Sequence, residues 1–148
     1  METYSLSESQ RERAKTLYEQ VDAGEITSPT EFVDEWQPRH KVTDYDPELV
    51  PYPEATEFID PSKIAGTTKT NLSRFSSGRI KTHLARFYHG EFERQRRCPP
   101  RLQKIEGQFY VTSDGVHRSL TAKALGISEL YVEYSIPPKE VLVSPEEI

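Results

Sequence analysis

The residues best suited to chemistry are the five consecutive ones from Asp114 to Arg118, in the order Asp-Gly-Val-His-Arg. They follow a predicted strand and open a predicted helix. The turn brings together a flexible glycine, the N–H groups that a helix N-terminus leaves unpaired, an imidazole and a guanidinium. Backbone amides and the helix dipole favour an anion, and a guanidinium can hold two phosphate oxygens at once. The pattern therefore predicts a binding site for a phosphate or a carboxylate.

Each polar side chain of this turn has a functional and a structural interpretation. Arg118 would clamp a phosphate or, as the less favoured alternative, pair with Asp114 at the start of its own helix. His117 would donate to a phosphate or transfer a proton, because imidazole titrates near neutral pH; the equal alternative is a hydrogen bond to the backbone. Asp114 is an N-cap by position, and as a catalytic group it would act as a base or hold Mg²⁺.

Elements on both sides must position the turn. Residues 102–105 and 108–112 are predicted to form a β-hairpin around Glu106-Gly107. The helix after the turn is expected to end at Gly126, and residues 130–134 return as a strand. This order predicts a strand, a tight turn, a helix and a second strand.

Two upstream segments could add to the site. Residues 65–78 are rich in small, hydroxylated and basic residues and predict either a loop with donors for an anion or a mobile surface loop. They lack the Gly-Lys-Ser/Thr ending of a P-loop. Apolar residues from Ile80 to Tyr88 recur at helical spacing. They predict a helix from Arg79, with Thr82 and Arg86 at its start and flank.

The first part of the chain is a predicted helical extension. Residues 7–10 and 28–31 both have the spacing of a capping box, and the second also has a proline at the first helical position. Residues 38–53 contain four prolines and are predicted to form an extended connector. We therefore divide the chain into an extension with its connector at residues 1–56 and a domain at residues 57–148.

Composition and charge limit the class of protein. The chain has 148 residues, 34% of them hydrophobic, and a net charge of −5, which fits one compact domain with a modest core. Acidic residues exceed basic ones by 10 in residues 1–62, whereas basic residues exceed acidic ones by 9 in residues 63–104. The basic middle predicts a nucleotide or a nucleic-acid backbone as ligand. An equal alternative is a solvated face that the acidic extension neutralises.

Cysteine content and hydropathy exclude several classes. The single cysteine, Cys98, excludes an internal disulfide framework and a cysteine-based zinc cluster. The sequence has no long apolar run and no signal-peptide pattern. We therefore expect a soluble, cytoplasmic protein with no membrane partner.

The central stretch carries a family resemblance. It runs from Pro99-Pro100 through the hairpin to the Asp114–Arg118 turn and on to Ala122, Leu125-Gly126 and a closing strand. This order resembles the ParB/sulfiredoxin superfamily, and residues 59–64 are similar to its opening strand. The resemblance covers residues 58–148. It implies an α/β (α+β) fold with a small mixed sheet flanked by helices, to which the N-terminal helical extension is added.

Members of this superfamily bind nucleotides at the corresponding turn. The resemblance implies a nucleotide, ATP or CTP, with Mg²⁺ as its companion ion. On the turn and its helix it assigns phosphate contacts to Gly115, Val116, His117, Arg118 and Ser119. On the helix before the hairpin it assigns further contacts to Arg79, Thr82 and Arg86.

Two departures narrow the activity that the resemblance implies. Val116 stands where a sulfiredoxin has its cysteine, which excludes sulfinic-acid reductase activity. ParB partition proteins carry an adjacent arginine pair and continue into a helix-turn-helix, whereas this chain has Arg118 alone and ends earlier. Site-specific centromere binding is therefore not expected.

Three functions remain open. The favoured one is a ParB-like nucleotide-binding protein associated with nucleic acid: a DNA-binding protein, a nuclease or NTPase, or a nucleotide-dependent regulator. The second is a small-molecule phosphotransferase, an ATP-dependent kinase, with Asp114 or a glutamate as base. The third is a non-catalytic module whose acidic N-terminal helices bind another protein or a second copy. In the favoured function, four arginines of the basic segment would follow a nucleic-acid backbone: Arg94, Arg96, Arg97 and Arg101.

Overall fold

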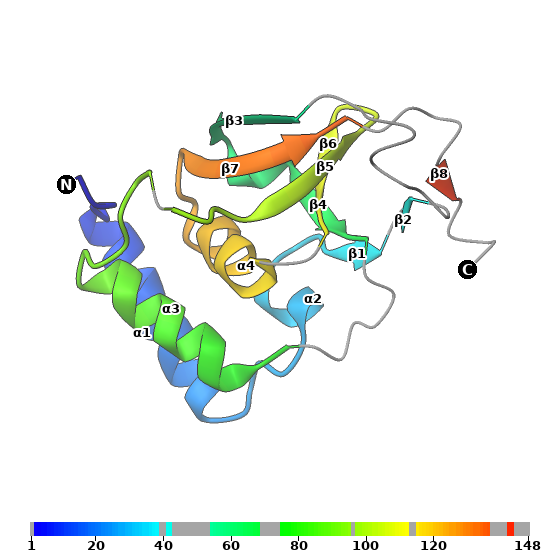
Figure 1. Ribbon diagram of the computed structural model, residues 1–148. Helices are drawn as coiled ribbons and strands as arrows, with labels where there is room; N and C mark the ends of the chain where they lie inside the picture. Colours follow the sequence, from blue (N-terminus) through cyan, green and yellow to red (C-terminus); the bar gives the residue numbers. More distant parts are fainter. Residues whose placement is uncertain are drawn as a thin grey trace.

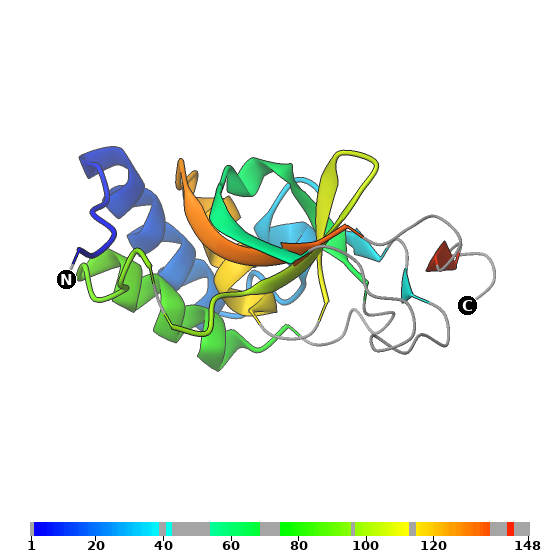
Figure 2. The same cartoon turned by 45° about the horizontal axis from the view of Figure 1, so that its top comes forward.

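The structure is a computed structural model that describes residues 2–38, 41–42, 54–68, 75–95, 97–112, 115–136 and 142–143. These residues form a mixed α/β fold with four α-helices and one larger, open sheet (Figures 1 and 2). The helices are α1 (Glu8–Asp22), α2 (Pro29–Phe32), α3 (Ser77–Tyr88) and α4 (Val116–Leu125), with a 3₁₀ turn η1 (Pro61–Lys63). The strands are β1 (Gln37–Pro38), β2 (Lys41–Val42), β3 (Glu54–Ile59), β4 (Ile64–Thr67), β5 (Arg101–Ile105), β6 (Gln108–Val111), β7 (Leu130–Ser135) and β8 (Leu142–Val143). None of the described helices is long and apolar enough to cross a lipid bilayer.

The larger sheet is mixed and has the strand order β1-β4-β6-β5-β7-β3. The pairs β1–β4, β4–β6 and β5–β7 are parallel, whereas β5–β6 and β3–β7 are antiparallel. The β5–β6 hairpin turns at Glu106 and Gly107, whose φ angles are 52° and 83°. Two successive left-handed residues are typical of a hairpin turn that matches the strand twist. The predicted hairpin and the α/β class are confirmed.

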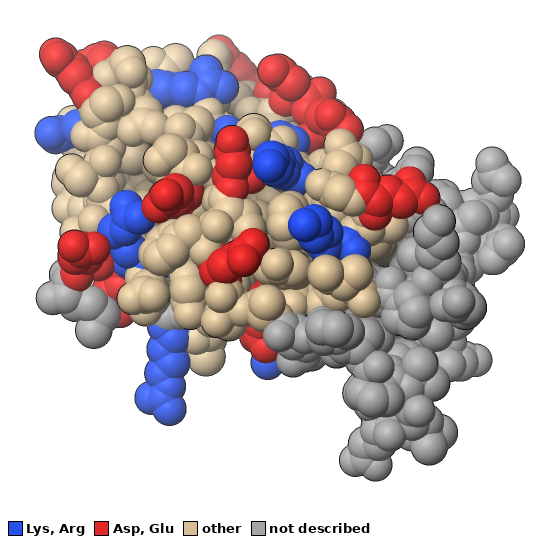
Figure 3. All heavy atoms as spheres, turned by 90° about the horizontal axis from the view of Figure 1, so that it is seen from above, with Lys and Arg blue, Asp and Glu red and all other residues tan. Residues whose placement is uncertain are grey.

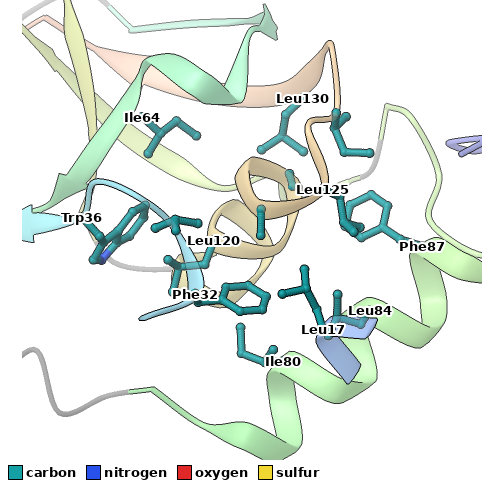
Figure 4. Close-up of a cluster of buried hydrophobic side chains, with 14 of the residues drawn as sticks. Leu17, Phe32, Trp36, Ile64, Ile80, Leu84, Phe87, Leu120, Leu125 and Leu130 are labelled. Carbon is teal, nitrogen blue, oxygen red and sulfur yellow. The ribbon is translucent and has the colours of Figure 1, made fainter. Parts of the chain in front are cut away.

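Helix α4 lies between the sheet and the pair of helices α1 and α3 (Figures 1 and 4). Six of its ten residues are buried, and four of these six are small. Small side chains let neighbouring elements approach closely, as dense packing requires. Figure 4 shows Leu120 and Leu125 between Ile64 and Leu130 on the sheet side and apolar side chains of the other helices, including Leu84. The core is therefore built around α4.

The two N-terminal helices start differently from each other. In α1 the predicted capping box is present, because Ser7 Oγ accepts from the Gln10 N–H and the Gln10 side chain accepts from the Ser7 N–H. Helix α2 has only four residues, and its Ser28 side chain does not cap it. Glu31 instead accepts hydrogen bonds from Thr27 and from the Ser28 hydroxyl. The second capping box is therefore wrong, because Glu31 engages the hydroxyl that the helix amides would need.

The described residues of the predicted loop at 65–78 include most of strand β4 at one end and the N-cap and first residues of α3 at the other. Strand β4 is buried at all four positions and pairs parallel on both sides. A strand buried on both faces shows no alternation of polar and apolar residues, so its sequence did not predict a strand. Helix α3 begins two residues before the predicted start, because Ser76 is its N-cap and accepts from the Arg79 N–H.

Helix α1 supplies hydrogen bonds to the C-terminus of α4. Arg13 Nε donates to the Ala124 carbonyl, and Gln10 Nε2 donates to the Gly126 carbonyl at 2.9 Å. Carbonyls in the last turn of a helix have no partner within the helix, and the helix dipole favours a cation there. Buried side chains of α1 and α2 also belong to the same hydrophobic cluster as those of the sheet. The boundary predicted between residues 56 and 57 falls within β3, and the division stays a prediction.

We expect Arg13→Ala to lower the free energy of unfolding by about 1 kcal/mol, because the Ala124 carbonyl loses a charged donor. The neighbouring change Glu12→Ala is the control, since Glu12 is exposed on the same helix; it should cost less than about 0.5 kcal/mol. Urea unfolding followed by circular dichroism measures both. Equal losses for the two variants would contradict a capping role for Arg13.

Candidate functional site

The turn between β6 and α4 is built around Gly115. This residue is the N-cap of α4 and has a left-handed φ of 93°. A β-carbon at Gly115 would lie 2.5 Å from Pro100 Cβ and 2.8 Å from Pro100 Cα. Glycine is thus required both for its φ and because Pro100 fills the space where a side chain would lie. Pro100 immediately precedes β5, and its contact with Gly115 constrains the turn.

His117 joins the first turn of α4 to the N-terminus of α3. The backbone N–H of Ser76, the N-cap of α3, donates to His117 Nε2 at 2.9 Å. Two helix N-termini are thereby held next to each other. Each has amides without a partner in its own helix and the positive end of a helix dipole. The backbone hydrogen bond that the sequence offered as the alternative for His117 is present.

Arg118 lies against the loop between α3 and β5. Its Nη2 donates to the Cys98 carbonyl at 3.4 Å, and the side chain is half-buried. Arg97 precedes Cys98 and is exposed; Arg101, also exposed, forms an ion pair with Glu133 at 3.4 Å. The structure therefore places Arg118 beside the segment that carries two other predicted arginines.

The N-terminal segment fixes the base of this loop. The Tyr4 N–H donates to the Phe92 carbonyl at 2.8 Å, and the Arg94 N–H donates to the Glu2 carbonyl at 3.0 Å. The Tyr4 hydroxyl accepts from the N–H of Tyr131 at 3.1 Å. Tyr131 belongs to β7, so the N-terminal segment ties the loop to the sheet. The loop then continues to Pro100 and the turn.

Two of the predicted phosphate contacts, Thr82 and Ser119, have side-chain hydroxyl groups. Thr82 is in the second turn of α3, because the helix starts at Ser77, and its hydroxyl donates to the Gly78 carbonyl at 2.9 Å. Ser119 is fully buried, and its hydroxyl has no hydrogen-bond partner among the described residues. Burial of the Ser119 hydroxyl does not fit a phosphate contact through that group, whereas the contact predicted for the exposed Thr82 stays a prediction. Arg79, in contrast, is exposed in the first turn of α3, at the end that carries Ser76.

Arg94 has a structural role in the fold. Its guanidinium pairs with Glu129 at 2.7 Å and with Glu2 at 3.9 Å, and it lies over the rings of Tyr4 and Phe58. These contacts hold the side chain between the N-terminal segment and the sheet. This arrangement matches an ion-pairing arginine and does not match a side chain extended toward a nucleic-acid backbone.

Some predicted residues lie outside the described part of the chain. Asp114, Arg96 and residues 69–74 are among these, so their predicted chemistry stays a prediction. The predicted N-cap at Asp114 is wrong, because Gly115 occupies the N-cap position. Within the described ranges, no group of three or more histidine, cysteine, aspartate or glutamate side chains could hold a metal ion.

Three residues that position the turn were not found from the sequence. Tyr4 gave no signal, because its partners are distant in the chain. Ser76 could have been recognised as an N-cap, since serine is a preferred N-cap residue and it stands just before the helical apolar pattern that begins at Ile80. Pro100 was noted in the sequence, but its contact with Gly115 follows only from the tertiary fold.

Charges of both signs share the face seen in Figure 3. Lysine and arginine side chains are interspersed there with aspartate and glutamate side chains. Opposite charges so close together reduce each other's field. The described part of this face therefore has no continuous positive patch, and the exposed arginines beside the turn are the better candidates for binding a polyanion.

No family model, curated protein or solved structure matches the chain. The ParB/sulfiredoxin-like assignment consequently stays a prediction from the sequence, and the geometry of the turn stands independently of it.

We expect Gly115→Ala to destabilise the protein by at least about 2 kcal/mol more than Gly24→Ala. Both glycines have a left-handed φ, 93° and 76°, but a β-carbon at Gly24 meets no atom within 4 Å. Gly24→Ala thus measures the backbone strain alone, about 1 kcal/mol, whereas Gly115→Ala adds the overlap with Pro100. Urea unfolding of the two variants gives the difference. Equal losses would show that Pro100 does not constrain the turn.

We expect Tyr4→Phe to cost about 1–2 kcal/mol at neutral pH, because the Tyr131 N–H loses its acceptor. Burial raises the pKa of the Tyr4 phenol above its ordinary value. Above about pH 10 the unfolded chain therefore loses the phenol proton while the folded chain keeps it. The stability advantage of tyrosine over phenylalanine should be complete below about pH 10 and fall as the pH rises further.

Urea unfolding of both proteins between neutral pH and pH 11 measures this difference. An advantage that stays constant or grows above about pH 10 would contradict a buried, protonated phenol.

Proposed function

We propose that this chain is a ParB-like nucleotide-binding protein that acts in association with nucleic acid and holds the phosphates of ATP or CTP at the turn before α4. The observation that supports the proposal best is the hydrogen bond from Ser76 N–H to His117 Nε2. It keeps the N-termini of α3 and α4 together, so that the amides and dipoles of two helices can act on one anion.

The residues of the turn divide into binding and positioning groups. The first-turn amides of α4, from Val116 onward, would donate to phosphate oxygens. Arg118 would add a charge-assisted hydrogen bond. One of its present contacts, the 3.4 Å hydrogen bond to the neutral Cys98 carbonyl, is long, and a phosphate is a stronger acceptor for a guanidinium. Gly115 and His117 would position these donors.

The nucleic-acid part of the proposal rests on the arginines next to the turn. Arg97 is exposed in the segment that Arg118 contacts, and Arg101 next to it is exposed although its guanidinium pairs with Glu133. Together with Arg79 at the start of α3, they extend the positive charge beyond what one nucleotide needs. Mg²⁺ would accompany the phosphates of the nucleotide, but the described residues provide no metal-binding cluster. No step of the proposal depends on the ion.

We expect ATP or CTP to bind the wild-type protein and Arg118→Gln to weaken that binding by about tenfold or more, because a charge-assisted hydrogen bond is lost. Isothermal titration calorimetry with each nucleotide, with and without Mg²⁺, measures the affinity. Thermal unfolding in the presence of nucleotide gives a second readout, since a ligand of the folded state raises the melting temperature.

Arg11→Gln is the matched control. It removes the same charge from α1 at a position where Arg11 lies over Tyr88, at the opposite end of α3 from Ser76. Its nucleotide affinity should equal that of the wild type. Binding to a short DNA duplex should also weaken steeply with added salt. The proposal fails if neither nucleotide binds, or if Arg118→Gln binds as tightly as Arg11→Gln; salt-independent or absent DNA binding removes its nucleic-acid part.

A further inference from the structure

Helices α1 and α3 leave a groove along the seam between them. They run antiparallel and side by side, on the side of α4 away from the sheet (Figure 1). The α1–α3 groove has a volume of about 490 Å³ and is lined by Ala14, Lys15, Tyr18, Glu19, Leu84, Ala85, Tyr88 and His89. A hollow of about 340 Å³ adjoins it at Tyr88 and His89, and another of about 340 Å³ adjoins it at Tyr18 and Ala85. The hollowed surface therefore follows the length of α3.

The groove combines a recess and a projecting side chain on one surface. Ala14 and Ala85 have short side chains, which leave space between the longer residues of the lining. Tyr18 lines the same groove and is 40% exposed, and among the described residues only Ile136 is another large apolar side chain exposed to this extent. A surface that carries a recess next to a projecting ring can fit a second copy of itself.

The charges along the groove side of α1 are ordered by sign. Arg11 and Lys15 lie in its N-terminal half, and Glu19 and Asp22 lie in its C-terminal half. Two of these residues contact α3 of the same chain. Arg11 lies over the Tyr88 ring, and Asp22 forms an ion pair with Lys81 at 3.0 Å. Lys15 and Glu19 both line the groove and are exposed, and neither forms an ion pair with any described residue.

This order of charges is self-complementary when two helices run in opposite directions. In an antiparallel pair, residues equally far from the twofold axis, on opposite sides, face each other. An axis level with Leu17 sets Lys15 against the partner's Glu19, and Glu19 against the partner's Lys15. The same axis sets Tyr18 level with the partner's Thr16, two residues or about 3 Å along the helix from Ala14. A parallel pair, in contrast, would place like charges together.

We propose that the α1–α3 groove is the interface of a homodimer in which two copies of α1 pack antiparallel. The contact buries Tyr18 of each protomer in the groove of the other and forms two Lys15–Glu19 ion pairs. Nucleic acid fits this surface less well, because Glu19 and Glu91 line the groove and its adjoining hollow. The interface is separate from the turn before α4, so it does not depend on the proposed nucleotide site.

Charge reversal tests this interface. Sedimentation velocity over a range of protein concentrations should show wild-type protein in a monomer–dimer equilibrium. Lys15→Glu and Glu19→Lys should each raise the dimer dissociation constant by about tenfold or more, since each change places two like-charged pairs across the axis. The double variant Lys15→Glu/Glu19→Lys should recover an affinity close to wild type, because both ion pairs form again with their signs exchanged.

Two further variants separate the interface from general effects. Lys63→Glu changes the net charge by the same amount as Lys15→Glu at an exposed position on η1, and it should leave the dimer intact. Tyr18→Ala should weaken the dimer while urea unfolding shows a folded monomer. A wild-type protein that stays monomeric at every concentration overturns the proposal. A double variant as weak as the single variants also overturns it, as does a Lys63→Glu variant that dissociates equally.

Discussion

The fold depends on enclosing α4 while providing partners for its terminal carbonyls and for the Lys123 ammonium group. A buried helix must satisfy its terminal carbonyls, and any cation on it must find acceptors. Here α1 donates to the last turn of α4 through Gln10 and Arg13. Lys123 donates to the carbonyls of Glu35 and Ile64, and burial lowers the pKa of its ammonium group. Segments that are far apart in the sequence thus meet on one short helix.

The same enclosure determines where the candidate site lies. The N-terminus of α4 is the end that the capping residues of α1 do not reach, and it carries Gly115 and the His117 bond to α3. Pro100 and the Cys98 carbonyl approach it from the loop that the N-terminal segment anchors. The turn is therefore set by contacts from two segments, the N-terminus of α3 and the loop before β5, which is the preorganisation that an anion site made of backbone amides needs.

Local sequence signals predicted turns and helix ends, whereas contacts between distant segments determined which side chains are buried or ion-paired. The hairpin at Glu106-Gly107, the stop at Gly126 and the Ser7 capping box depend on neighbouring residues, and all three are present. Strand β4 was missed because a strand buried on both faces lacks alternation. At the site, the sequence identified Gly115 and Arg118, whereas the burial of Ser119 and the anchoring of Arg94 follow from packing that no local pattern encodes.

The hydrogen bond between Tyr4 and Tyr131 joins residues 127 positions apart. Contacts of such long range must close a large chain loop before they contribute any stability, which slows folding. During synthesis α1 is made before α4, whose last turn it caps, and before β7, whose Tyr131 N–H donates to the Tyr4 hydroxyl. The contacts of the N-terminal segment with α4 and β7 therefore cannot form until both of these elements have been made. Cotranslational folding of the N-terminal segment onto its native partners is thus tied to the synthesis of β7.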